Sequence, residues 1–357
     1  MDARIALLPG DGIGPEVTAA AKEVLRVVGE LGGHHFEFLT APIGGAAIDQ
    51  GGEPLPPSTL EICESADAAL LGAVGGPQWP PEASVRPEQG LLALRQHFGL
   101  FANLRPIKVF PAMVHRAPLR PERLEGVDLL IVRELTGGLY FGPRREQGAG
   151  SSAHDTLVYS EDEVERIARL AFEIAQGRRG QVTSVDKANV LASMRLWRRT
   201  VEKVAGEFSG VRLEHALVDS CAMQLLLEPS AYDVIVAGNL FGDILSDEAA
   251  VLAGSLGLLP SASLGKGRFG VYEPVHGSAP DLAGLGLANP IGAILSAAML
   301  LRHSLGLEDE ANLVERAVHQ ALDEGIWTAD LDPRSTPAST MEMARAVCHG
   351  MTPAVII

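Results

Sequence analysis

The stretch Asn239-Leu-Phe-Gly-Asp243-Ile-Leu-Ser-Asp247 carries two aspartates four residues apart and follows a strand-like apolar run. It is typical of the opening of a helix, where residues at this spacing project from one face. Hard divalent cations such as Mg²⁺ prefer oxygen ligands, and Asp219 is a third acid that can complete a shared site. Alternatively, Asp243 and Asp247 are solvated acids favoured by the helix dipole. Gly242 and the flanking apolar residues indicate a packed segment, so we predict a metal site.

The composition is that of a globular protein and limits the possible partners. The chain has 357 residues, of which 46% are hydrophobic and 21% charged. A net charge of −16, with 29 Lys and Arg against 45 Asp and Glu, argues against nucleic acid and against an anionic membrane surface. We therefore expect neither as a partner.

Cysteine usage and the lack of long apolar segments predict a cytoplasmic protein. Cys63, Cys221 and Cys348 are scattered and form no C-x-x-C pair, which indicates a reducing compartment without a disulfide framework or a zinc site. The short apolar run before Gly10 is not a signal peptide. The longest apolar stretch, Ile291 to Leu301, is too short to span a bilayer.

Strand-like and helix-like segments alternate along the chain, which predicts an α/β sheet covered by helices. The helical segments expected first are Pro15 to about Gly32 and a capped helix that begins after Ser160 and stops near Gly177. The chain is expected to be mostly helical from Leu287 onwards. The expected strands are Ile5–Leu8, Ala68–Val74, Leu129–Val132, Val182–Val185, Leu213–Val218 and Val234–Ala237.

The glycine-rich loop from Gly10 to Gly14 follows a strand and precedes a helix, as a dinucleotide-binding loop does. Its spacing is G-x-G-x-G-P rather than G-x-G-x-x-G, and no acidic residue clearly ends a second strand about 20 residues further on. A tight turn that brings the backbone close to a ligand is the better interpretation. We therefore do not expect a Rossmann fold.

Three arginines lie at the ends of apolar segments: Arg95, Arg105 and Arg133. A guanidinium group grips a carboxylate with two hydrogen bonds, so together the three suit a dicarboxylic acid, although most arginines form ordinary surface ion pairs. Tyr140 lies in a glycine-flanked turn, and Lys187 follows a strand. A desolvated lysine in such a place can act as a base.

Seven segments together resemble the β-decarboxylating dehydrogenase family, which contains the isocitrate and isopropylmalate dehydrogenases. The resemblance covers essentially the whole chain. The segments, in family order, are Leu8–Glu16, Arg86–Arg95, Phe101–Pro106, Val132–Gly142, Asp186–Val190, Asn239–Asp247 and Glu273–Asp281.

The resemblance implies a role for each matching residue. The family oxidises a 2-hydroxy acid with NAD(P)⁺ and then removes the carboxylate β to the new ketone. A divalent ion acts as the Lewis acid. The implied catalytic residues are Tyr140 and Lys187. The implied metal ligands are Asp219, Asp243 and Asp247, with Mg²⁺ or Mn²⁺ as the ion. The implied substrate-binding residues are Glu88, Leu91, Leu92, Arg95, Arg105, Arg133, Asn189 and Asp219. The implied cofactor-binding residues are Glu273, His276, Gly277, Ser278, Ala279, Asp281 and Asn289.

The resemblance also implies the architecture. The family fold is an open mixed sheet split into two domains and is not a Rossmann fold. Residues 1–100 and 254–357 are expected to bind the cofactor, and residues 101–253 to bind substrate and metal and to form the dimer. In the family, the residues matching Lys187 and Asp219 reach the neighbouring subunit's site, so a homodimer with shared active sites is implied.

The segment before Arg95 bears on the choice of substrate. Leu91 and Leu92 offer an apolar pocket for an isopropyl group, and Glu88 would repel a third carboxylate. We therefore expect NAD⁺-dependent oxidation and decarboxylation of 3-isopropylmalate, a step of leucine biosynthesis. Homoisocitrate, isocitrate or tartrate as substrate is the enzymatic alternative, and an inactive metal-binding paralogue is the non-enzymatic one.

Two further residues, Asp281 and Cys221, bear on the choice of cofactor and on sensitivity to oxidation. An acid at Asp281 can accept hydrogen bonds from ribose hydroxyls and would repel a 2′-phosphate, which favours NAD⁺ over NADP⁺. Cys221 lies just after Asp219, where relatives often carry alanine. A thiol in that place would make the site sensitive to oxidation.

Overall fold

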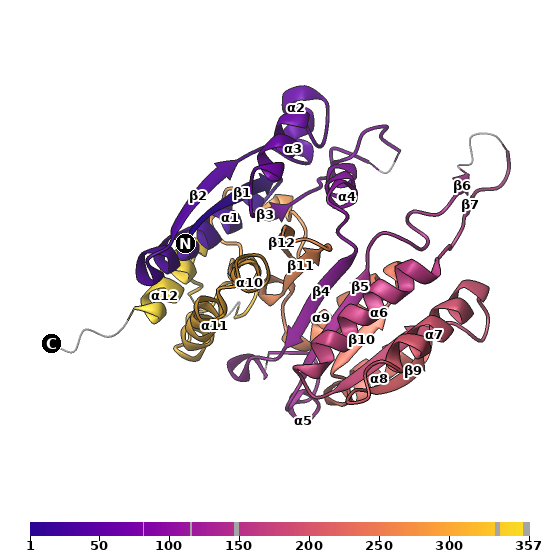
Figure 1. Cartoon of the computed structure of the whole chain (residues 1–357). Helices are drawn as coiled ribbons and strands as arrows, with labels where there is room; N and C mark the ends of the chain where they lie inside the picture. The colour runs from indigo at the N-terminus through magenta and orange to yellow at the C-terminus, as the bar shows by residue number, and fades with distance from the viewer. Residues whose placement is uncertain (81, 115, 146–149, 333–335, 353–357) are drawn as a thin grey trace. The chain divides into compact units, whose positions relative to one another are not determined.

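Two compact units make up the chain in the computed structural model, which describes residues 1–80, 82–114, 116–145, 150–332 and 336–352 (Figure 1). Unit 1 comprises Met1–Leu100, Phe110–Arg116 and Ala253–Ile357. Unit 2 comprises Phe101–Val109 and Ala117–Leu252. The segment Phe110–Arg116 thus clusters with unit 1, although the chain on either side of it belongs to unit 2.

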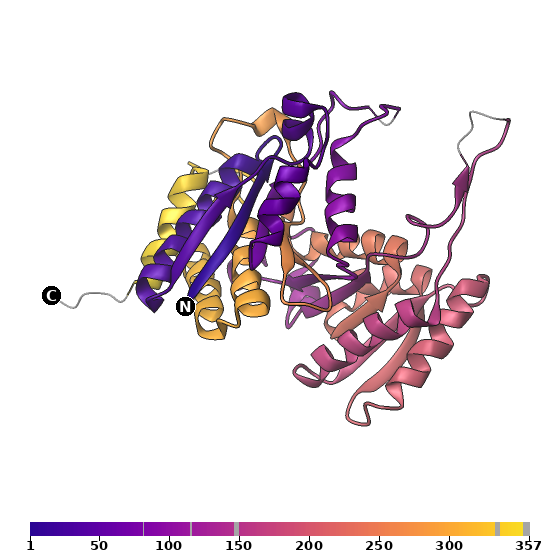
Figure 2. The ribbon, with the colours of Figure 1, turned by 45° about the horizontal axis from the view of Figure 1, so that its top comes forward.

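Unit 1 is a mixed sheet with helices packed on it. The strand order is β2-β1-β3-β12-β11, in which β11 runs antiparallel to β12 and the other neighbours are parallel. The strands are β1 (Asp2–Gly10), β2 (His35–Thr40), β3 (Ala68–Ala73), β11 (Pro260–Leu264) and β12 (Gly270–Pro274). The helices are α1 (Gly14–Gly32), α2 (Gly45–Gly51), α3 (Pro57–Glu64), α4 (Pro87–His97), α10 (Ile291–Leu300), α11 (Glu308–Asp323) and α12 (Thr340–Met351). Helices α1 and α10 pack against the sheet and against α11 and α12 (Figure 2).

Unit 2 has the same kind of architecture. Its strand order is β4-β5-β10-β8-β9, in which β4 is antiparallel to β5 and the others are parallel. The strands are β4 (Ala102–Lys108), β5 (Asp128–Glu134), β8 (Gln181–Asp186), β9 (Arg212–Leu217) and β10 (Val234–Ala237), with a separate pair, β6 (Arg144–Arg145) and β7 (His154–Asp155). The helices are α5 (Pro121–Leu124), α6 (Glu161–Gln176), α7 (Ala192–Ala205), α8 (Val218–Leu227) and α9 (Asn239–Ala250). Helix α6 packs against α7, and α8 against α9.

The elements expected from local sequence patterns are confirmed. Every residue of β3 is buried, as a continuous apolar run predicts for a strand covered on both faces. Helix α1 has proline in its first turn and is capped at its C-terminal end by Gly33, which adopts a left-handed conformation. Ser160 caps α6 through a reciprocal pair with Glu163. The predicted open mixed α/β sheet is therefore present.

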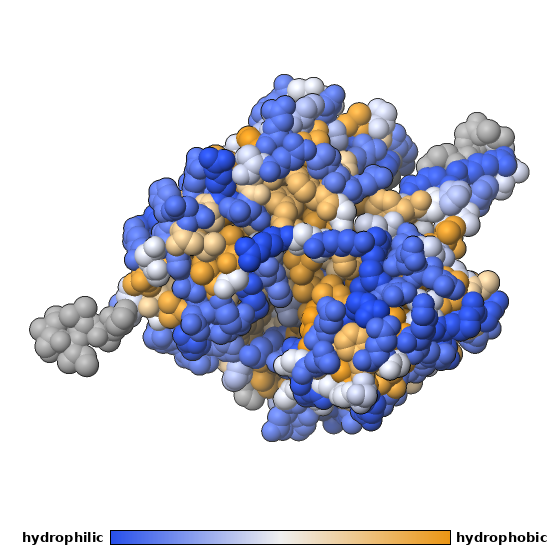
Figure 3. Space-filling model, in the orientation of Figure 1, coloured by the Kyte–Doolittle hydropathy of each residue, from blue (hydrophilic) through white to orange (hydrophobic). Residues whose placement is uncertain are grey.

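Apolar side chains fill the interior of each unit. In unit 2 the largest fully buried side chains include Trp197 and Phe172, and in unit 1 they include Tyr272 and Leu70. Hydrophilic residues cover much of the surface on the face seen in Figure 3. Among the described residues, no helix combines the length and apolar character needed to cross a membrane.

The backbone of the glycine-rich turn between β1 and α1 packs directly against the backbone of Ser278. Gly12 has φ +58°, and a Cβ at this position would lie 1.9 Å from the carbonyl oxygen of Ser278. The amide of Ile13 donates to the same oxygen at 2.8 Å. The buried carboxylate of Asp11 accepts the backbone amides of Gly45, Ala46 and Gly75 at 2.9, 2.7 and 2.8 Å. The turn therefore supports the segment that begins at His276.

A substitution at Gly12 tests this packing. Gly12→Ala adds a backbone clash to the strain of a positive φ, whereas Gly33→Ala adds only the strain, because a Cβ at Gly33 (φ +65°) meets nothing within 4 Å. We expect Gly33→Ala to lower the free energy of unfolding by about 1 kcal/mol and Gly12→Ala by about 1–3 kcal/mol more. Urea unfolding of both variants measures the difference, and equal losses would contradict the close approach.

Candidate active site

Helix α9 presents the two aspartates of the opening stretch on one face. Asp243 and Asp247 lie one helical turn apart, as their spacing predicts. The side chain of Asp243 is 29% exposed and that of Asp247 is 65% exposed. Gly242 makes room for Arg133, since a Cβ at Gly242 would lie 2.8 Å from Cγ of Arg133. The segment is thus packed through Gly242 while its carboxylates remain accessible.

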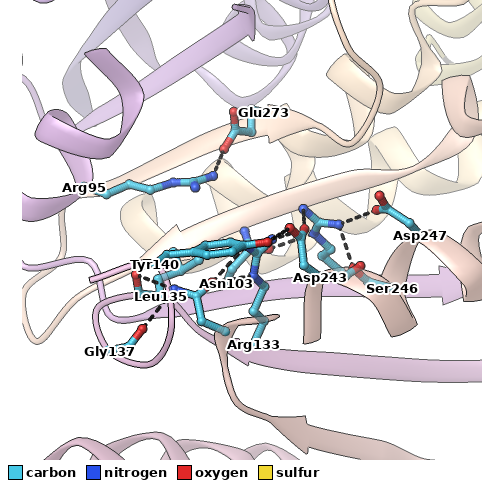
Figure 4. Close-up of polar contacts among 12 residues, drawn as sticks. Arg95, Asn103, Arg133, Leu135, Gly137, Tyr140, Asp243, Ser246, Asp247 and Glu273 are labelled. Carbon is cyan, nitrogen blue, oxygen red and sulfur yellow. Dashed lines mark hydrogen bonds and ion pairs between the residues drawn. The ribbon is translucent and has the colours of Figure 1, made fainter. Parts of the chain in front are cut away.

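Two of the three predicted arginines meet these carboxylates (Figure 4). Arg105 on β4 lies with Nη1 2.9 Å from Oδ1 of Asp247 and with Nη2 3.6 Å from Oδ1 of Asp243. Arg133 on the adjacent strand β5 pairs through Nη1 with Oδ1 of Asp243. The side chain of Arg133 is only 6% exposed, so its ion pair is not an ordinary surface contact. Two guanidinium groups and two carboxylates therefore form one cluster of charges in unit 2.

Tyr140 joins the same cluster. Its hydroxyl donates to Oδ2 of Asp243 at 3.0 Å, and its ring lies 5.8 Å from the guanidinium of Arg133. Burial raises the pKa of Tyr140, and the charge and hydrogen bond of Asp243 raise that pKa further. The phenol therefore keeps its proton at neutral pH and can serve as a proton donor.

A fully buried carboxylate, Glu134, shapes the turn that leads to Tyr140. It accepts the amides of Thr136 and Gly137 at 2.9 and 2.8 Å and the hydroxyl of Thr136 at 2.7 Å. Arg166 lies 3.3 Å from it, yet burial outweighs these contacts and raises the pKa of Glu134. Glu134 lies in the segment Val132–Gly142 but carried no predicted role; the available signal was an acid at the end of a buried strand, shortly before Gly137 and Gly138.

Lys187 and Asp219 form a second pair within unit 2. Nζ of Lys187, just beyond β8, lies 2.5 Å from Oδ1 of Asp219 in the first turn of α8. The hydrogen bond from Lys187 lowers the pKa of Asp219, whose side chain is 62% exposed. Asn189 is exposed in the turn after Lys187. Among the described residues of the single chain, no three acids, histidines or cysteines gather as a metal site, so Asp219 does not join Asp243 and Asp247.

In unit 1, helix α4 presents the predicted specificity residues on one face. Glu88, Leu91, Leu92 and Arg95 follow the i, i+3, i+4, i+7 pattern. Leu91 packs partly against the core of unit 1, whereas Leu92 is 38% exposed. Nη2 of Arg95 lies 2.5 Å from Oε1 of Glu273, and the buried Nε of Arg95 has no hydrogen-bond partner among the described residues. Arg95 is thereby tied to a residue expected to contact the cofactor.

The segment after β12 has the features of a ligand-binding loop. Nε2 of His276 is buried and has no hydrogen-bond partner in the part of the chain that the structure describes, and burial lowers the pKa of this imidazole, which keeps it neutral. Ala279 adopts φ +36°, a strained value for a residue other than glycine, and Asp281 is exposed. Gly277 is also exposed, whereas Ser278 is buried against the turn at Gly12.

Asn289, also expected at the cofactor, makes structural contacts. Its Nδ2 donates to Asp330 at 3.0 Å, and its Oδ1 accepts the amide of Ile291 at the start of α10 at 3.0 Å. Both ends of the amide are therefore engaged within unit 1.

The expected sensitivity of Cys221 to oxidation is wrong for the chain as described. Cys221 is fully buried, and burial raises the pKa of its thiol to about 11. Because the thiolate is the reactive form, a buried thiol with a raised pKa is inert at neutral pH.

The comparisons with known proteins agree over nearly the whole chain. A family model described as isocitrate/isopropylmalate dehydrogenase matches residues 4–347. The 3-isopropylmalate dehydrogenase of Bacillus licheniformis is 58% identical over 352 residues, covering 97% of this chain and 95% of that protein. That of Geobacillus kaustophilus is 58% identical over 351 residues, with 96% and 94% covered. The solved isocitrate dehydrogenase from Methylococcus capsulatus has a TM-score of 0.87 at 36% identity and covers 98% and 99% of the two chains. The expected type of open mixed sheet is thus confirmed.

The thiols provide a test of this part of the structure. Burial raises the pKa of Cys63 to about 12 and that of Cys348 to about 11, so all three thiols remain protonated at pH 8. We expect 5,5′-dithiobis(2-nitrobenzoate) at pH 8 to react slowly with the native protein and with all three cysteines at once in denaturant. Fast reaction of Cys221 in the native protein at pH 8 would contradict its burial.

Proposed function

We propose that this chain, which belongs to the isocitrate/isopropylmalate dehydrogenase family, oxidises 3-isopropylmalate with NAD⁺ and decarboxylates it to 4-methyl-2-oxopentanoate and CO₂ in leucine biosynthesis. The observation that carries the proposal is the cluster in which Arg105 and Arg133 meet Asp243, Asp247 and Tyr140. Relatives named for 3-isopropylmalate are 58% identical, whereas the structural relative named for isocitrate is 36% identical.

Substrate binding is assigned to the arginines. A malate-like dicarboxylate needs fixed positive charge, and the guanidinium groups of Arg105 and Arg133 supply it from neighbouring strands. By resemblance, Arg95 adds a third contact from α4. These residues hold the substrate in one orientation. Fixed orientation of the reacting groups supplies a large part of the rate enhancement.

The residues fit a divalent metal ion. Asp243 and Asp247 offer oxygen ligands on one helical face, and Asp219 is the third oxygen ligand that the resemblance implies. When bound there, Mg²⁺ or Mn²⁺ would supply positive charge that stabilises the negative oxygen of the substrate during oxidation and decarboxylation. Arg105 and Arg133, the two arginines of unit 2 assigned to the substrate, form ion pairs with these two carboxylates.

Two side chains handle the protons. Lys187 is assigned to removal of the hydroxyl proton as hydride passes to NAD⁺, and Tyr140 to protonation of the carbon left when CO₂ departs. One proton leaves oxygen and one returns to carbon, so the reaction releases no net proton. The phenol of Tyr140 suits the role of donor, because it keeps its proton at neutral pH until the carbanion forms.

Cofactor binding is assigned to the segment from Glu273 to Asp281 and to Asn289. The buried Nε2 of His276, which no described residue hydrogen-bonds, supports this assignment, because such an atom is usually satisfied by a ligand or by water. Gly277, Ser278 and Ala279 lie in the same segment, next to the turn at Gly12. The exposed carboxylate of Asp281 favours NAD⁺, since it would repel a 2′-phosphate.

A cytoplasmic homodimer with shared active sites is the proposed assembly. The α8–α9 pair of unit 2 exposes large apolar side chains: Met223, at 54%, Leu227, at 45%, and Ile244, at 54%. Such a surface favours a symmetric helix-to-helix contact with a second copy. In that assembly, Asp219 and Lys187 of one chain would complete the site that contains Asp243 and Asp247 of the other.

The substrate panel tests the proposal directly. Burying an isopropyl group against Leu91 and Leu92 is worth roughly 2 kcal/mol, or about 30-fold, so 3-isopropylmalate should exceed isocitrate, homoisocitrate and tartrate in kcat/KM by about that factor. Leu92→Ala should reduce the preference for 3-isopropylmalate in kcat/KM by about 3- to 10-fold. Leu31 is an exposed leucine on α1, and the control Leu31→Ala should leave this preference unchanged. Faster turnover of isocitrate than of 3-isopropylmalate would overturn the assignment.

The cofactor preference gives a second test. We expect kcat/KM to be at least about tenfold higher with NAD⁺ than with NADP⁺, because repulsion between Asp281 and a 2′-phosphate costs on the order of 1–2 kcal/mol. Asp281→Lys should lower the ratio of kcat/KM with NAD⁺ to kcat/KM with NADP⁺. Asp323→Lys makes the same charge change at another exposed site of unit 1 and should leave this ratio unchanged. An unchanged ratio in Asp281→Lys would reject Asp281 as the discriminating residue.

A further inference from the structure

Asn239 opens helix α9 and is 1% exposed, although it lies only four residues before Asp243. None of the roles assigned above uses it. Buried amides are retained where their hydrogen bonds are made, so the partners of Asn239 indicate what it does.

The amide oxygen of Asn239 holds one edge of Arg133. Oδ1 accepts from Nε of Arg133 at 3.1 Å and from Nη2 at 2.9 Å. Nη1 of the same guanidinium pairs with Asp243. Contacts at two nitrogens on one edge and at a third nitrogen fix both the plane and the direction of a planar group.

The amide nitrogen of Asn239 faces backbone carbonyls instead. Nδ2 donates to the carbonyl oxygens of Leu135 and Gly137 at 3.1 and 3.3 Å. The orientation of the amide is unambiguous, because arginine only donates and a carbonyl only accepts. The backbone amide of Asn239 donates to the hydroxyl of Tyr159 at 2.7 Å, which fixes the start of α9.

The turn at Leu135 to Gly137 has other supports. Glu134 accepts two amides and a hydroxyl from it, and the amide of Leu135 donates to Phe101 at 2.8 Å. Loss of the Asn239 side chain would therefore leave the turn with most of its hydrogen bonds. The guanidinium of Arg133 would lose the bidentate acceptor opposite the Asp243 contact.

We propose that Asn239 is a positioning residue that orients Arg133 for the carboxylate of the substrate. This inference rests on the proposed function, in which Arg133 binds the substrate. Without Asn239, the guanidinium can turn towards Asp243 and away from a bound dicarboxylate. The role is exerted through Arg133, so its effect belongs to substrate binding and not to the cofactor.

The test uses two substitutions of Asn239 and a matched control. Asn239→Ala removes the amide, and Asn239→Ser keeps a hydrogen-bonding group suited to a helix start but cannot engage both nitrogens of Arg133. Asn312→Ala is the control, because Oδ1 of Asn312 also accepts from an arginine, Nη2 of Arg302 at 2.9 Å, on α11 of unit 1. We expect both Asn239 variants to raise KM for the hydroxy acid about tenfold, with KM for NAD⁺ within about twofold of the native value.

The split between the two KM values distinguishes positioning from a structural role. Loss of folded protein lowers the maximal rate but leaves both KM values of the remaining enzyme unchanged. Thermal unfolding of each variant measures the folded fraction. If Asn239→Ala does not fold, Asn239→Ser gives the same comparison. Unchanged KM for the hydroxy acid in the folded variants would overturn the proposal.

A double-mutant cycle with Arg133→Ala tests whether Asn239 acts through Arg133. Adding Asn239→Ala to Arg133→Ala should change KM for the hydroxy acid by less than about twofold, because the group to be oriented is gone. Additive losses would overturn the proposal. The cycle is run with whichever acid of the four-substrate panel the native protein prefers. If the native protein prefers another acid, the proposed substrate is wrong. The role of Asn239 is then still decided by the double-mutant cycle, because the cycle uses the preferred acid.

Discussion

The ion pairing between two arginines and two aspartates holds the proposed catalytic part of unit 2 together. Arg133 is almost fully buried, and a buried guanidinium is destabilising by several kcal/mol unless it is paired and hydrogen-bonded. Asp243 supplies the countercharge and also receives the hydroxyl of Tyr140. Asp247 supplies a countercharge to Arg105, whose Nη1 lies 2.9 Å from Oδ1 of Asp247. Strands β4 and β5 and helix α9 are therefore fixed relative to one another by the groups proposed to bind substrate and metal.

Much of the fold could be predicted because its signals are local. The buried run of β3 and the capping box at Ser160 act over a few residues, and the structure has both. The four-residue spacing of Asp243 and Asp247 likewise needs only the period of a helix. The resemblance to a known family added the expected sheet type, which periodicity alone could not give.

The remainder depends on contacts between residues far apart in sequence. Arg95 meets Glu273 across 178 positions, and Arg133 meets Asn239 across 106. An acid at the end of a buried strand was a weak local signal for Glu134, and no local pattern marks Asn239, because each acts by where the fold puts its hydrogen bonds. Strands β11 and β12 were not expected either, since strand pairing is decided by the sheet. Cys221 shows the same limit: its position beside Asp219 indicated reactivity, whereas its burial makes it inert.

We propose that one chain does not complete the site alone, since among the described residues of unit 2 Asp219 pairs with Lys187 and forms no group of three potential metal ligands with Asp243 and Asp247. The direct measurement is refolding of a mixture of the inactive variants Asp247→Asn and Lys187→Ala, followed by an assay with Mg²⁺ or Mn²⁺. Random pairing should restore about a quarter of native activity, because half of the dimers would contain one intact site. Activity that stays at the level of the separate variants, with heterodimers demonstrated by native mass spectrometry, would contradict the shared site.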